Sequence, residues 1–565
     1  MKTVTFRRPA GQGKGRQVSP ASQARLAELI TDSPLRRDLL IEYLHRIQDA
    51  EGCLPQGLLA ALAQAMKLSQ VEVFEVASFY HHFDLVADDE PRPPALTVRV
   101  CDSLSCEIAG AATLIERLQA LVGAEVRVQS VPCVGRCAQA PVAVVGRLPL
   151  PQANVDAVIA HAKGDSRECP LPTGQPAGGD RGEAIPAPPP GAWPVLQSLI
   201  DGAAQPADVM ARLESSALRG MGGAGFPAGR KWRIVAGFHG PRMLVVNADE
   251  GEPGTFKDRF WLECEPRRFL EGMLIAAWAV GCETCVIYLR DEYAGVRALL
   301  EREISALHAA PPLRWSLPAI ELRRGAGAYV CGEESALIES IEGKRGMPRL
   351  RPPYVAEVGL HGRPTLAHNV ETLAWVPIIL QQGAAWFAAH GRRGRKGLRS
   401  FSVSGRVREP GVKIAPAGIS LHELIAEYCG GMAEGHSLAA FLPGGASGGV
   451  LPASLADEPL DFDTLQPHGA FIGSAAVIVL SQQDDLRRAA QNLMRFFRLE
   501  SCGQCTPCRV GTAKAVTLMD APTWNEPLLR ELSQTMIDAS ICGLGQAAPN
   551  PVLSLFRHFP KVVRS

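Results

Sequence analysis

The feature that most constrains this chain is a glycine-rich segment followed by a buried strand and a group of acids. Residues 219–232 read RGMGGAGFPAGRKW, with glycines at Gly220, Gly222, Gly223, Gly225 and Gly229. Glycine reaches positive φ and lets the backbone approach a ligand closely. Successive backbone N–H groups can then line an anion, and Lys231 adds a positive charge. The segment therefore predicts a phosphate-binding loop.

The residues after this loop predict the rest of a nucleotide site. Leu244–Val246 form a short apolar run typical of a buried strand. The polar residues Asn247, Asp249, Glu250 and Glu252 follow it directly. Ligands of open α/β sheets bind at the carboxyl ends of the strands, so these side chains suit ribitol or ribose hydroxyls. Because the glycine spacing is neither G-x-G-x-x-G nor a Walker A loop, a glycine-rich surface turn is the alternative.

Length and composition limit the class of protein to which this chain can belong. A chain of 565 residues predicts several domains, since single cores stop growing near ~250–300 residues. The formal net charge is zero, which favours neither nucleic acid nor a membrane surface as a partner. No apolar run approaches the ~20 residues of a membrane span, and no apolar signal core follows the basic N-terminus. We therefore predict a cytoplasmic protein without direct membrane contact.

Fifteen cysteines in such a chain indicate metal or redox chemistry rather than disulfides. The first group follows the predicted strand Leu96–Val100 in a small α/β unit, with C-x4-C and C-x3-C spacing: Cys101, Cys106, Cys133 and Cys137. Four thiolates suit either tetrahedral zinc or an iron–sulfur cluster.

The second cysteine group lies in the predicted C-terminal helices. Its spacing is C-x2-C-x2-C with a distant fourth member: Cys502, Cys505, Cys508 and Cys542. This spacing is typical of a [4Fe–4S] site, whereas zinc more often uses two separated pairs. By contrast, Cys282 and Cys285 flank an apolar strand with no second pair nearby, and we interpret them as core thiols.

A second glycine–acid segment, GAGAYVCGEESALIESIEGKRGMPRLRPPY, carries Glu333 and Glu334 directly after Gly332. Together, the two glycine–acid segments and the two cysteine groups resemble one family. It comprises the FMN- and NADH-binding subunit of respiratory NADH dehydrogenases and of the related soluble formate dehydrogenases and hydrogenases. The first cysteine group resembles the thioredoxin-like [2Fe–2S] small subunit of the same enzymes, so two subunits look fused here.

The resemblance implies a multidomain α/β and α fold. The expected order is a flexible arm (1–20), a helical bundle (21–90), a thioredoxin-like [2Fe–2S] domain (95–163) and a Pro/Gly-rich linker (164–195). A Rossmann-like FMN- and NAD-binding domain (196–388), a ubiquitin-like β-grasp domain (389–480) and a helical [4Fe–4S] domain (481–565) would follow. The linker composition predicts no regular structure.

The resemblance also assigns site residues. FMN would be held by Gly220, Gly222, Lys231, Asn247, Asp249, Glu250, Tyr329, Gly332, Glu333, His368, Asn369 and Thr372. NAD(H) would contact Phe226, Glu252, Glu334, Arg351 and Tyr354. No catalytic acid or nucleophile is expected, because hydride transfer needs only a near-attack geometry between flavin and nicotinamide.

Three positions depart from the family pattern. His368 stands where the family usually has the first of two asparagines, Arg351 replaces a lysine, and Ile234 replaces an aromatic residue near the adenine. Arginine keeps the charge of lysine but not its shape.

The segments HNVETLAWV and SGRVREPGVKIAPAG look most like the beta subunit of soluble, molybdenum- or tungsten-dependent formate dehydrogenases. That resemblance implies a large alpha subunit that carries a metal–pterin site and further Fe–S clusters. Electrons from formate would pass through [4Fe–4S], with one [2Fe–2S] also present, to FMN and NAD⁺. The alternatives are the NADH-input module of a respiratory NADH:quinone oxidoreductase, the diaphorase of an NAD-reducing hydrogenase, and a zinc-stabilised nucleotide-binding scaffold without activity.

Overall fold

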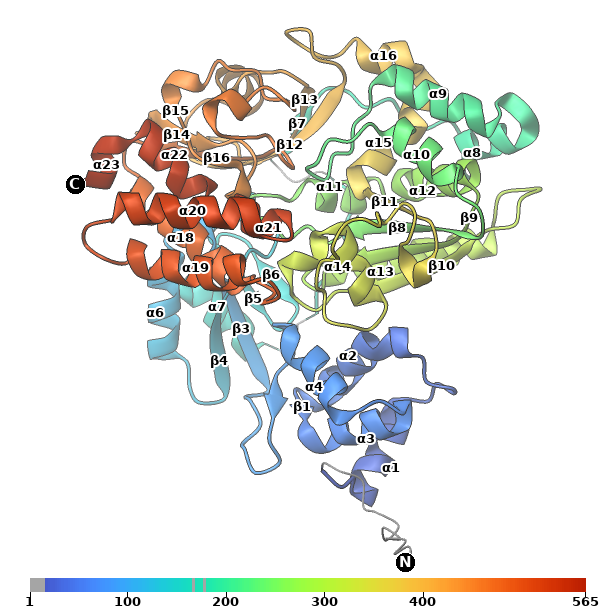
Figure 1. Cartoon of the computed structure of the whole chain (residues 1–565), viewed down its shortest axis with the longest axis vertical. Helices are drawn as coiled ribbons and strands as arrows, with labels where there is room; N and C mark the ends of the chain where they lie inside the picture. The colour runs from blue at the N-terminus through green and yellow to red at the C-terminus, as the bar shows by residue number, and fades with distance from the viewer. Residues whose placement is uncertain (1–15, 165–167, 176–178, 565) are drawn as a thin grey trace, which may run out of the picture.

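The computed structural model describes residues 16–164, 168–175 and 179–564, so most of the arm predicted for residues 1–20 lies outside the described residues. Five units follow one another along the chain (Figure 1). We name them the N-terminal helical domain, the small α/β domain, the central α/β domain, the β12–β16 domain and the C-terminal helical domain.

The N-terminal helical domain lies at the bottom of Figure 1. Its helices are α1 (Pro20–Leu29), α2 (Leu40–Glu51), α3 (Gln56–Met66) and α4 (Gln70–Phe79), and the short strands β1 (Leu54–Pro55) and β2 (Leu85–Val86) pair in parallel. Tyr43, Leu44 and Ile47 of α2 are fully buried, as their helical spacing predicts. Ser69 and Glu72 form the capping box that starts α4.

The small α/β domain has a four-stranded sheet in the order β4-β3-β5-β6. Its elements are β3 (Leu96–Cys101), α5 (Leu104–Ile108), α6 (Ala111–Leu121), β4 (Val126–Val131), β5 (Ala143–Val145), β6 (Leu148–Leu150) and α7 (Val155–Lys163). Strand β3 pairs in parallel with β4 and antiparallel with β5. Cys101 is the last residue of β3, which is an inner strand of this sheet.

The central α/β domain has a parallel sheet in the order β10-β9-β8-β11. The strands are β8 (Arg242–Ala248), β9 (Cys282–Leu289), β10 (Ala319–Arg324) and β11 (Thr365–Asn369). The helices are α8 (Pro194–Ser198), α9 (Pro206–Ser216), α10 (Ala228–Ala236), α11 (Lys257–Cys264), α12 (Pro266–Val280), α13 (Ala294–Ala309), α14 (Glu334–Ile341), α15 (Val370–Gln382) and α16 (Ala384–Ala388). Leu244–Val246 are buried in β8, and Cys282 and Cys285 are buried in β9, so both predictions are confirmed.

The β12–β16 domain has a six-stranded sheet in the order β15-β14-β16-β12-β13-β7. Its strands are β12 (Leu398–Gly405), β13 (Gly411–Pro416), β14 (Leu438–Leu442), β15 (Leu451–Pro452) and β16 (Ala476–Ser481), with the short helix α17 (Leu421–Glu423) after β13. The ubiquitin-like assignment stays a prediction. The serines of β12 do not face solvent as an alternating strand would suggest, because Ser402 and Ser404 are fully buried under neighbouring domains.

The edge strand of this sheet corrects the prediction that the linker has no regular structure. Strand β7 (Arg181–Gly182) comes from the linker and pairs in parallel with β13. Gly182 lies tightly against Ile414, where a Cβ would come within 2.6 Å of the Ile414 Cβ. The Pro/Gly-rich composition therefore gave no sign of this short strand. Its pairing with β13 depends on a close approach of the two backbones at Gly182.

The C-terminal helical domain lies on the left of Figure 1. Its helices are α18 (Leu486–Leu499), α19 (Thr506–Met519), α20 (Glu526–Ala539), α21 (Gly543–Ala547), α22 (Asn550–His558) and α23 (Pro560–Arg564). Within the described ranges, none of the helices has both the length and the apolar character needed to cross a membrane.

Candidate functional site

The glycine-rich loop is a tight turn at the carboxyl edge of the central sheet. The Gly220 amide donates to the Phe226 carbonyl at 2.8 Å, and Gly223 and Gly225 have φ of +126° and +65°. The Met221 amide donates to the Thr372 hydroxyl at 2.8 Å, which ties the loop to the first turn of α15. A Cβ on Gly222 would lie 3.2 Å from the Asn369 Cβ. The glycines thus keep a cradle open between the loop and β11.

Polar side chains line the end of β8 beside this cradle. Asn247 donates to the Gly332 carbonyl at 2.7 Å, which joins the two glycine–acid segments. Asp249 Oδ2 is buried and has no hydrogen-bond partner in the described part of the chain. Burial raises the pKa of Asp249 to about 8, helped by Glu292 and Glu500 and opposed by Arg290. An orphaned buried carboxyl beside a glycine cradle fits a ligand that brings hydroxyl groups, as the ribitol of FMN does.

Glu250 has a different environment from the one we predicted. Its carboxylate accepts the amides of Asp258 at 2.8 Å and Arg259 at 3.2 Å, and the hydroxyl of Tyr293 at 2.9 Å. It therefore caps the start of α11. Its predicted contact with flavin stays a prediction.

Glu252 connects three domains. It accepts a short hydrogen bond from the Tyr329 hydroxyl. Its other oxygen accepts the Ser447 amide at 2.8 Å and the Ser447 hydroxyl at 2.7 Å. The Tyr329 amide donates to Glu500 at 2.8 Å, two residues before Cys502. The acid predicted to contact NAD(H) thus touches the β12–β16 domain and, through Tyr329, is linked to the C-terminal helical domain.

Two of the remaining predicted NAD(H) residues, Glu334 and Arg351, form ion pairs with each other and with residues predicted to bind FMN. Lys231 lies 3.3 Å from Glu334, and Arg351 lies 3.2 Å from Glu334 while also contacting Glu333. Phe226 and Tyr354 are 41% and 58% exposed, which leaves their aromatic faces available to a base. The structure therefore gathers the predicted charged residues, and it leaves the predicted aromatic residues on the surface.

His368 is buried at the end of β11 and accepts a hydrogen bond from the Trp232 indole at 2.8 Å. Burial and nearby Lys231 hold the pKa of His368 well below its usual range. The imidazole is therefore neutral with its proton on Nδ1, since Nε2 is the acceptor. Asn369 caps α15 by accepting the Thr372 amide at 3.2 Å.

The first cysteine group converges at the junction with the central domain. Cys133 and Cys137 have their sulfurs 3.2 Å apart, and the thiol of Cys101 interacts with those of Cys106 and Cys133. All four are buried. Four convergent thiols in a dry site fit the donor set of a [2Fe–2S] cluster.

Two arginines of the central domain hold the loop that carries these thiols. Arg290 donates to the Cys133 carbonyl at 2.6 Å and also to the Glu250 carbonyl, and it pairs with Glu292 at 2.6 Å. Arg259 donates to the Gly135 carbonyl at 3.1 Å. Sequence reasoning missed both arginines. The available signal was that Arg290 directly follows strand β9 and that Arg259 lies shortly after the acidic residues 249–252.

The second cysteine group lies at the starts of two helices. Cys505 precedes α19, Cys508 lies in its first turn, and Cys542 precedes α21. Helix N-termini stabilise thiolates and therefore suit metal ligands. Burial raises the pKa of the Cys508 thiol to about 12 and that of Cys542 to about 11, so cluster assembly must displace their protons. Across the described residues, no group of three or more His, Cys, Asp or Glu side chains is arranged around a single metal-ion position.

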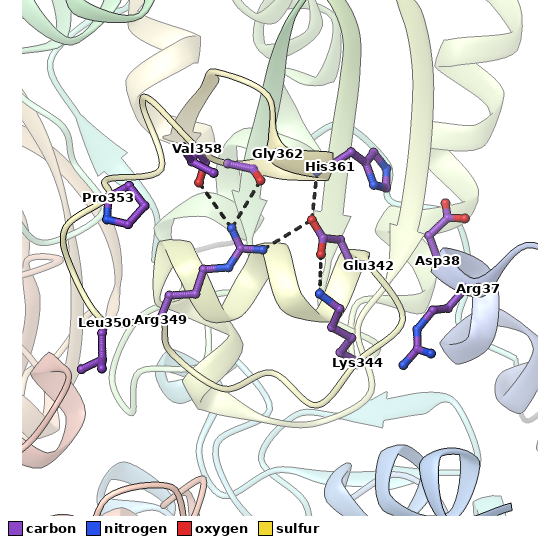
Figure 2. A pocket seen from close by; sticks show the side chains of 11 residues that line it. Arg37, Asp38, Glu342, Lys344, Arg349, Leu350, Pro353, Val358, His361 and Gly362 are labelled. Carbon is purple, nitrogen blue, oxygen red and sulfur yellow. Dashed lines mark hydrogen bonds and ion pairs between the residues drawn. The ribbon is translucent and has the colours of Figure 1, made fainter. Parts of the chain in front are cut away.

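A pocket of about 630 Å³ lies away from these groups, between the N-terminal helical domain and the segment after α14 (Figure 2). Figure 2 shows Glu342 between Arg349 and Lys344, whose charged atoms lie 3.4 Å and 2.7 Å from it. The pocket contains no residue predicted to bind FMN or NAD. Since its charges pair with one another, it gives no argument for a ligand.

Comparisons with known proteins support three regions of the predicted fold: an FMN-binding region, a thioredoxin-like [2Fe–2S] region and a C-terminal iron–sulfur region. Residues 213–378 match the Nuo51 FMN-binding domain, residues 26–162 the thioredoxin-like [2Fe-2S] ferredoxin, and residues 488–565 the NADH-ubiquinone oxidoreductase-F iron-sulfur binding region. An F-type subunit of the NADH-quinone oxidoreductase of Rhizobium meliloti (strain 1021) is 41% identical over 367 residues, which is 63% of this chain and 87% of that protein. The mitochondrial NADH dehydrogenase [ubiquinone] flavoprotein 1 of Dictyostelium discoideum is 42% identical over 368 residues, 62% of this chain and 77% of that protein.

A solved structure extends the similarity to almost the whole chain. The crystal structure of an NAD+-reducing [NiFe]-hydrogenase in the H2-reduced state has a chain that is 34% identical, with a TM-score of 0.81. The similarity covers 94% of this chain and 92% of that one. Fold and site thus define an NAD-linked oxidoreductase subunit with FMN, a [2Fe–2S] and a [4Fe–4S] region. The chain belongs to the family of the F-type NADH-quinone oxidoreductase subunits and the NADH dehydrogenase flavoproteins.

Proposed function

We propose that this chain is the diaphorase subunit of a multisubunit complex, in which it exchanges hydride with NAD(H) and passes single electrons between FMN and a partner. The observation that carries the proposal is the contact of both cysteine groups with one acidic segment. Arg290 bonds the carbonyls of Glu250 and Cys133. Tyr329 bonds Glu252 and, through its amide, Glu500 beside Cys502.

FMN, when bound, supplies the exchange between two-electron hydride transfer and one-electron steps. We propose that Gly220, Gly222 and Lys231 bind its phosphate side, with His368, Asn369 and Thr372 at the start of α15. His368 would act there as a neutral donor rather than a cation, because Trp232 occupies its Nε2. Burial favours the protonated form of Asp249, which would donate a proton as well as accept one from a ligand hydroxyl. No residue is assigned as a general acid or base.

The ion pairs of Glu334 suggest how the dinucleotide would bind. Glu334 pairs with Lys231 and Arg351 at 3.3 Å and 3.2 Å. An incoming pyrophosphate would compete for Arg351, and the freed Glu334 carboxylate could then accept ribose or amide donors. Phe226 and Tyr354 would stack on the adenine, since aromatic faces are exposed on both.

The partner's substrate has three candidates with different support: hydrogen, formate and, for a respiratory module, quinone. A hydrogenase-type partner is supported by the solved NAD+-reducing [NiFe]-hydrogenase, whose chain is covered to 92% and so shares the fused organisation. A formate dehydrogenase partner, with a molybdenum- or tungsten-pterin alpha subunit, is supported by the segments 368–376 and 404–418. The similar proteins described above carry quinone, ubiquinone or hydrogenase names, so the comparisons support a respiratory module or a hydrogenase-type partner better than a formate dehydrogenase partner.

Purification of the complex from its native cell through this chain tests the proposal. Nickel with hydrogen-dependent NAD⁺ reduction would establish the hydrogenase candidate. Molybdenum or tungsten with formate-dependent reduction would establish the formate candidate, and neither metal with quinone activity would indicate a respiratory module. A colourless protein with zinc and no flavin would refute all three, because the assigned clusters predict about six irons per chain.

A further inference from the structure

A second pocket, of about 220 Å³, lies where the segment before the glycine-rich loop meets the segment leading into β12. Four cations and a single acid line it: Arg219, Arg395, Lys396, Arg399 and Asp461. Gly222, Lys231 and Asn369 do not contribute to its wall, so it differs from the cradle assigned to FMN. Nothing in the proposed function accounts for this concentration of positive charge.

Arg399 is the least satisfied of these cations. It is 2% exposed, and its Nη1 has no hydrogen-bond partner among the residues that the structure describes. Its Nη2 lies 3.6 Å from Asp461, beyond a normal hydrogen bond, and its guanidinium stacks 4.0 Å from the centre of the Phe462 ring. A buried guanidinium with an unmade hydrogen bond is costly, which points to a group absent from the protein itself.

The acids around the pocket do not balance its cations. Asp461 pairs with Arg395 at 2.6 Å and is shared with Arg399. Asp463 pairs with Arg219 at 2.6 Å. Glu371 attracts Arg399 at longer range but is itself ion-paired with Lys257 at 3.1 Å. Lys396 is exposed and makes no ion pair within the described ranges. One to two positive charges thus remain uncompensated.

We propose that this pocket binds a small multivalent oxyanion of the phosphate class through Arg399, Arg395 and Lys396. The guanidinium fork matches the geometry of phosphate oxygens. A volume of about 220 Å³ equals roughly seven waters at ~30 Å³ each, which admits one phosphate group with water but not a dinucleotide. The ligand is inorganic phosphate or the phosphate group of a small monoester.

The pocket is coupled to the flavin loop through Arg219. This residue lines the pocket, stacks 4.5 Å from the Phe462 ring centre and donates to the Gly225 carbonyl inside the glycine-rich loop. An anion in the pocket would therefore hold the loop in its observed conformation. We expect it to slow the loss of FMN without entering the flavin site.

The test uses the full chain loaded with FMN and clusters, titrated calorimetrically with inorganic phosphate at constant ionic strength in chloride. Saturable binding is expected, with a rise in the temperature at which flavin is released. Lys396→Ala should weaken phosphate affinity about ten-fold, the loss of one charged hydrogen bond. Lys514→Ala, at an exposed lysine of α19, is the matched control and should leave affinity unchanged.

Arg399→Lys keeps the charge but removes the fork, and it should also weaken binding while preserving the fold. Equal affinity of glycerol phosphate would identify a monoester as the ligand class, and binding of inorganic phosphate alone would identify the free ion. Absence of saturable binding, or equal affinities in Lys396→Ala and Lys514→Ala, would overturn the proposal. Flavin content and NADH oxidation by ferricyanide test the proposed function separately, since neither depends on added phosphate.

Discussion

Lys257 forms a buried ion triad under the flavin loop, and its removal gives a sharp test of how the site is held. Its side chain is 1% exposed, with Nζ 2.8 Å from Asp258 and 3.1 Å from Glu371. Asp258 also accepts the Asn369 amide group at 3.1 Å. Asn369 in turn caps α15, whose Thr372 hydroxyl accepts the Met221 amide of the glycine-rich loop. Lys257 thus supports the loop through three intermediates, Asp258, Asn369 and Thr372.

Lys257→Met should leave two buried carboxylates without their cation. Breaking a buried pair by removing one partner costs about 3–5 kcal/mol. For a domain of ~150–250 residues, each kcal/mol shifts the melting temperature by about 2–4 °C. The variant should therefore release FMN about 6–20 °C below the wild type. Although burial alone would lower it, Asp258 and Glu371 raise the pKa of Lys257. Its folded-state pKa lies above its ordinary value near ~10.5, so its stabilising charge is fully present below that value and is lost only as pH rises through the folded pKa.

A double-variant cycle separates the charge effect from a general packing defect. Glu371→Gln removes one buried charge but keeps an oxygen to accept the Ser400 amide, now bonded at 2.8 Å. Lys257→Met/Glu371→Gln should recover at least ~1.5 kcal/mol of the loss, within the range seen for residues in one network. Flavin fluorescence on heating at one scan rate is the assay, because a multidomain chain need not melt in two states. A Lys257→Met midpoint within 2 °C of wild type, or additive effects, would refute the reasoning.

Three other changes test the site. The pKa of Asp249 is about 8 in the folded protein and near ~4 in the unfolded chain, so the stability of the FMN-depleted protein should fall as pH rises between those values. Asp249→Asn should flatten this fall in melting scans from pH 6 to 8.5. An unchanged slope would contradict the prediction. Glu252→Gln should raise the NADPH/NADH ratio of kcat/KM about ten-fold by removing a buried negative charge, and an unchanged ratio would exclude Glu252 from coenzyme selection. Cys505→Ser should abolish electron exchange with the partner but spare NADH oxidation by ferricyanide; retention of both activities would remove that cluster from the route.

The sequence predicted what is encoded locally. Cysteine spacing predicted the two iron–sulfur regions that the family models match, because the proposed ligands lie at element ends, as Cys101 at the end of β3 and Cys505 before α19 do. The apolar run Leu244–Val246 identified β8 because a buried parallel strand has no polar face. Glycine crowding identified the loop because only glycine reaches φ of +126°, the value at Gly223, at low cost.

What the sequence could not predict depends on contacts between distant segments. Ser402 and Ser404 look solvent-facing in their strand, but Ser402 accepts the Phe256 amide at 3.0 Å and Ser404 bonds Ser105 at 2.9 Å. Ser447 gives no local signal, yet it donates twice to Glu252 across 195 positions. Lys257 lies shortly after the acidic residues 249–252. One of its carboxylate partners, Asp258, is its neighbour, but the other, Glu371, is more than a hundred residues away in the sequence.

The fused chain explains how a small cluster domain is kept in register with the flavin site. The cluster loop is held by polar contacts of Arg290 and Arg259 and by apolar packing of Cys133 and Cys137 against Phe256, and two separate subunits would have to associate to make these contacts. A covalent linker converts that association into an intramolecular one. Pairing of β7 with β13 shortens the free length of the linker by fixing its middle to the β12–β16 domain. The linker therefore contributes a strand to the β12–β16 domain in addition to its covalent connection to the small α/β domain.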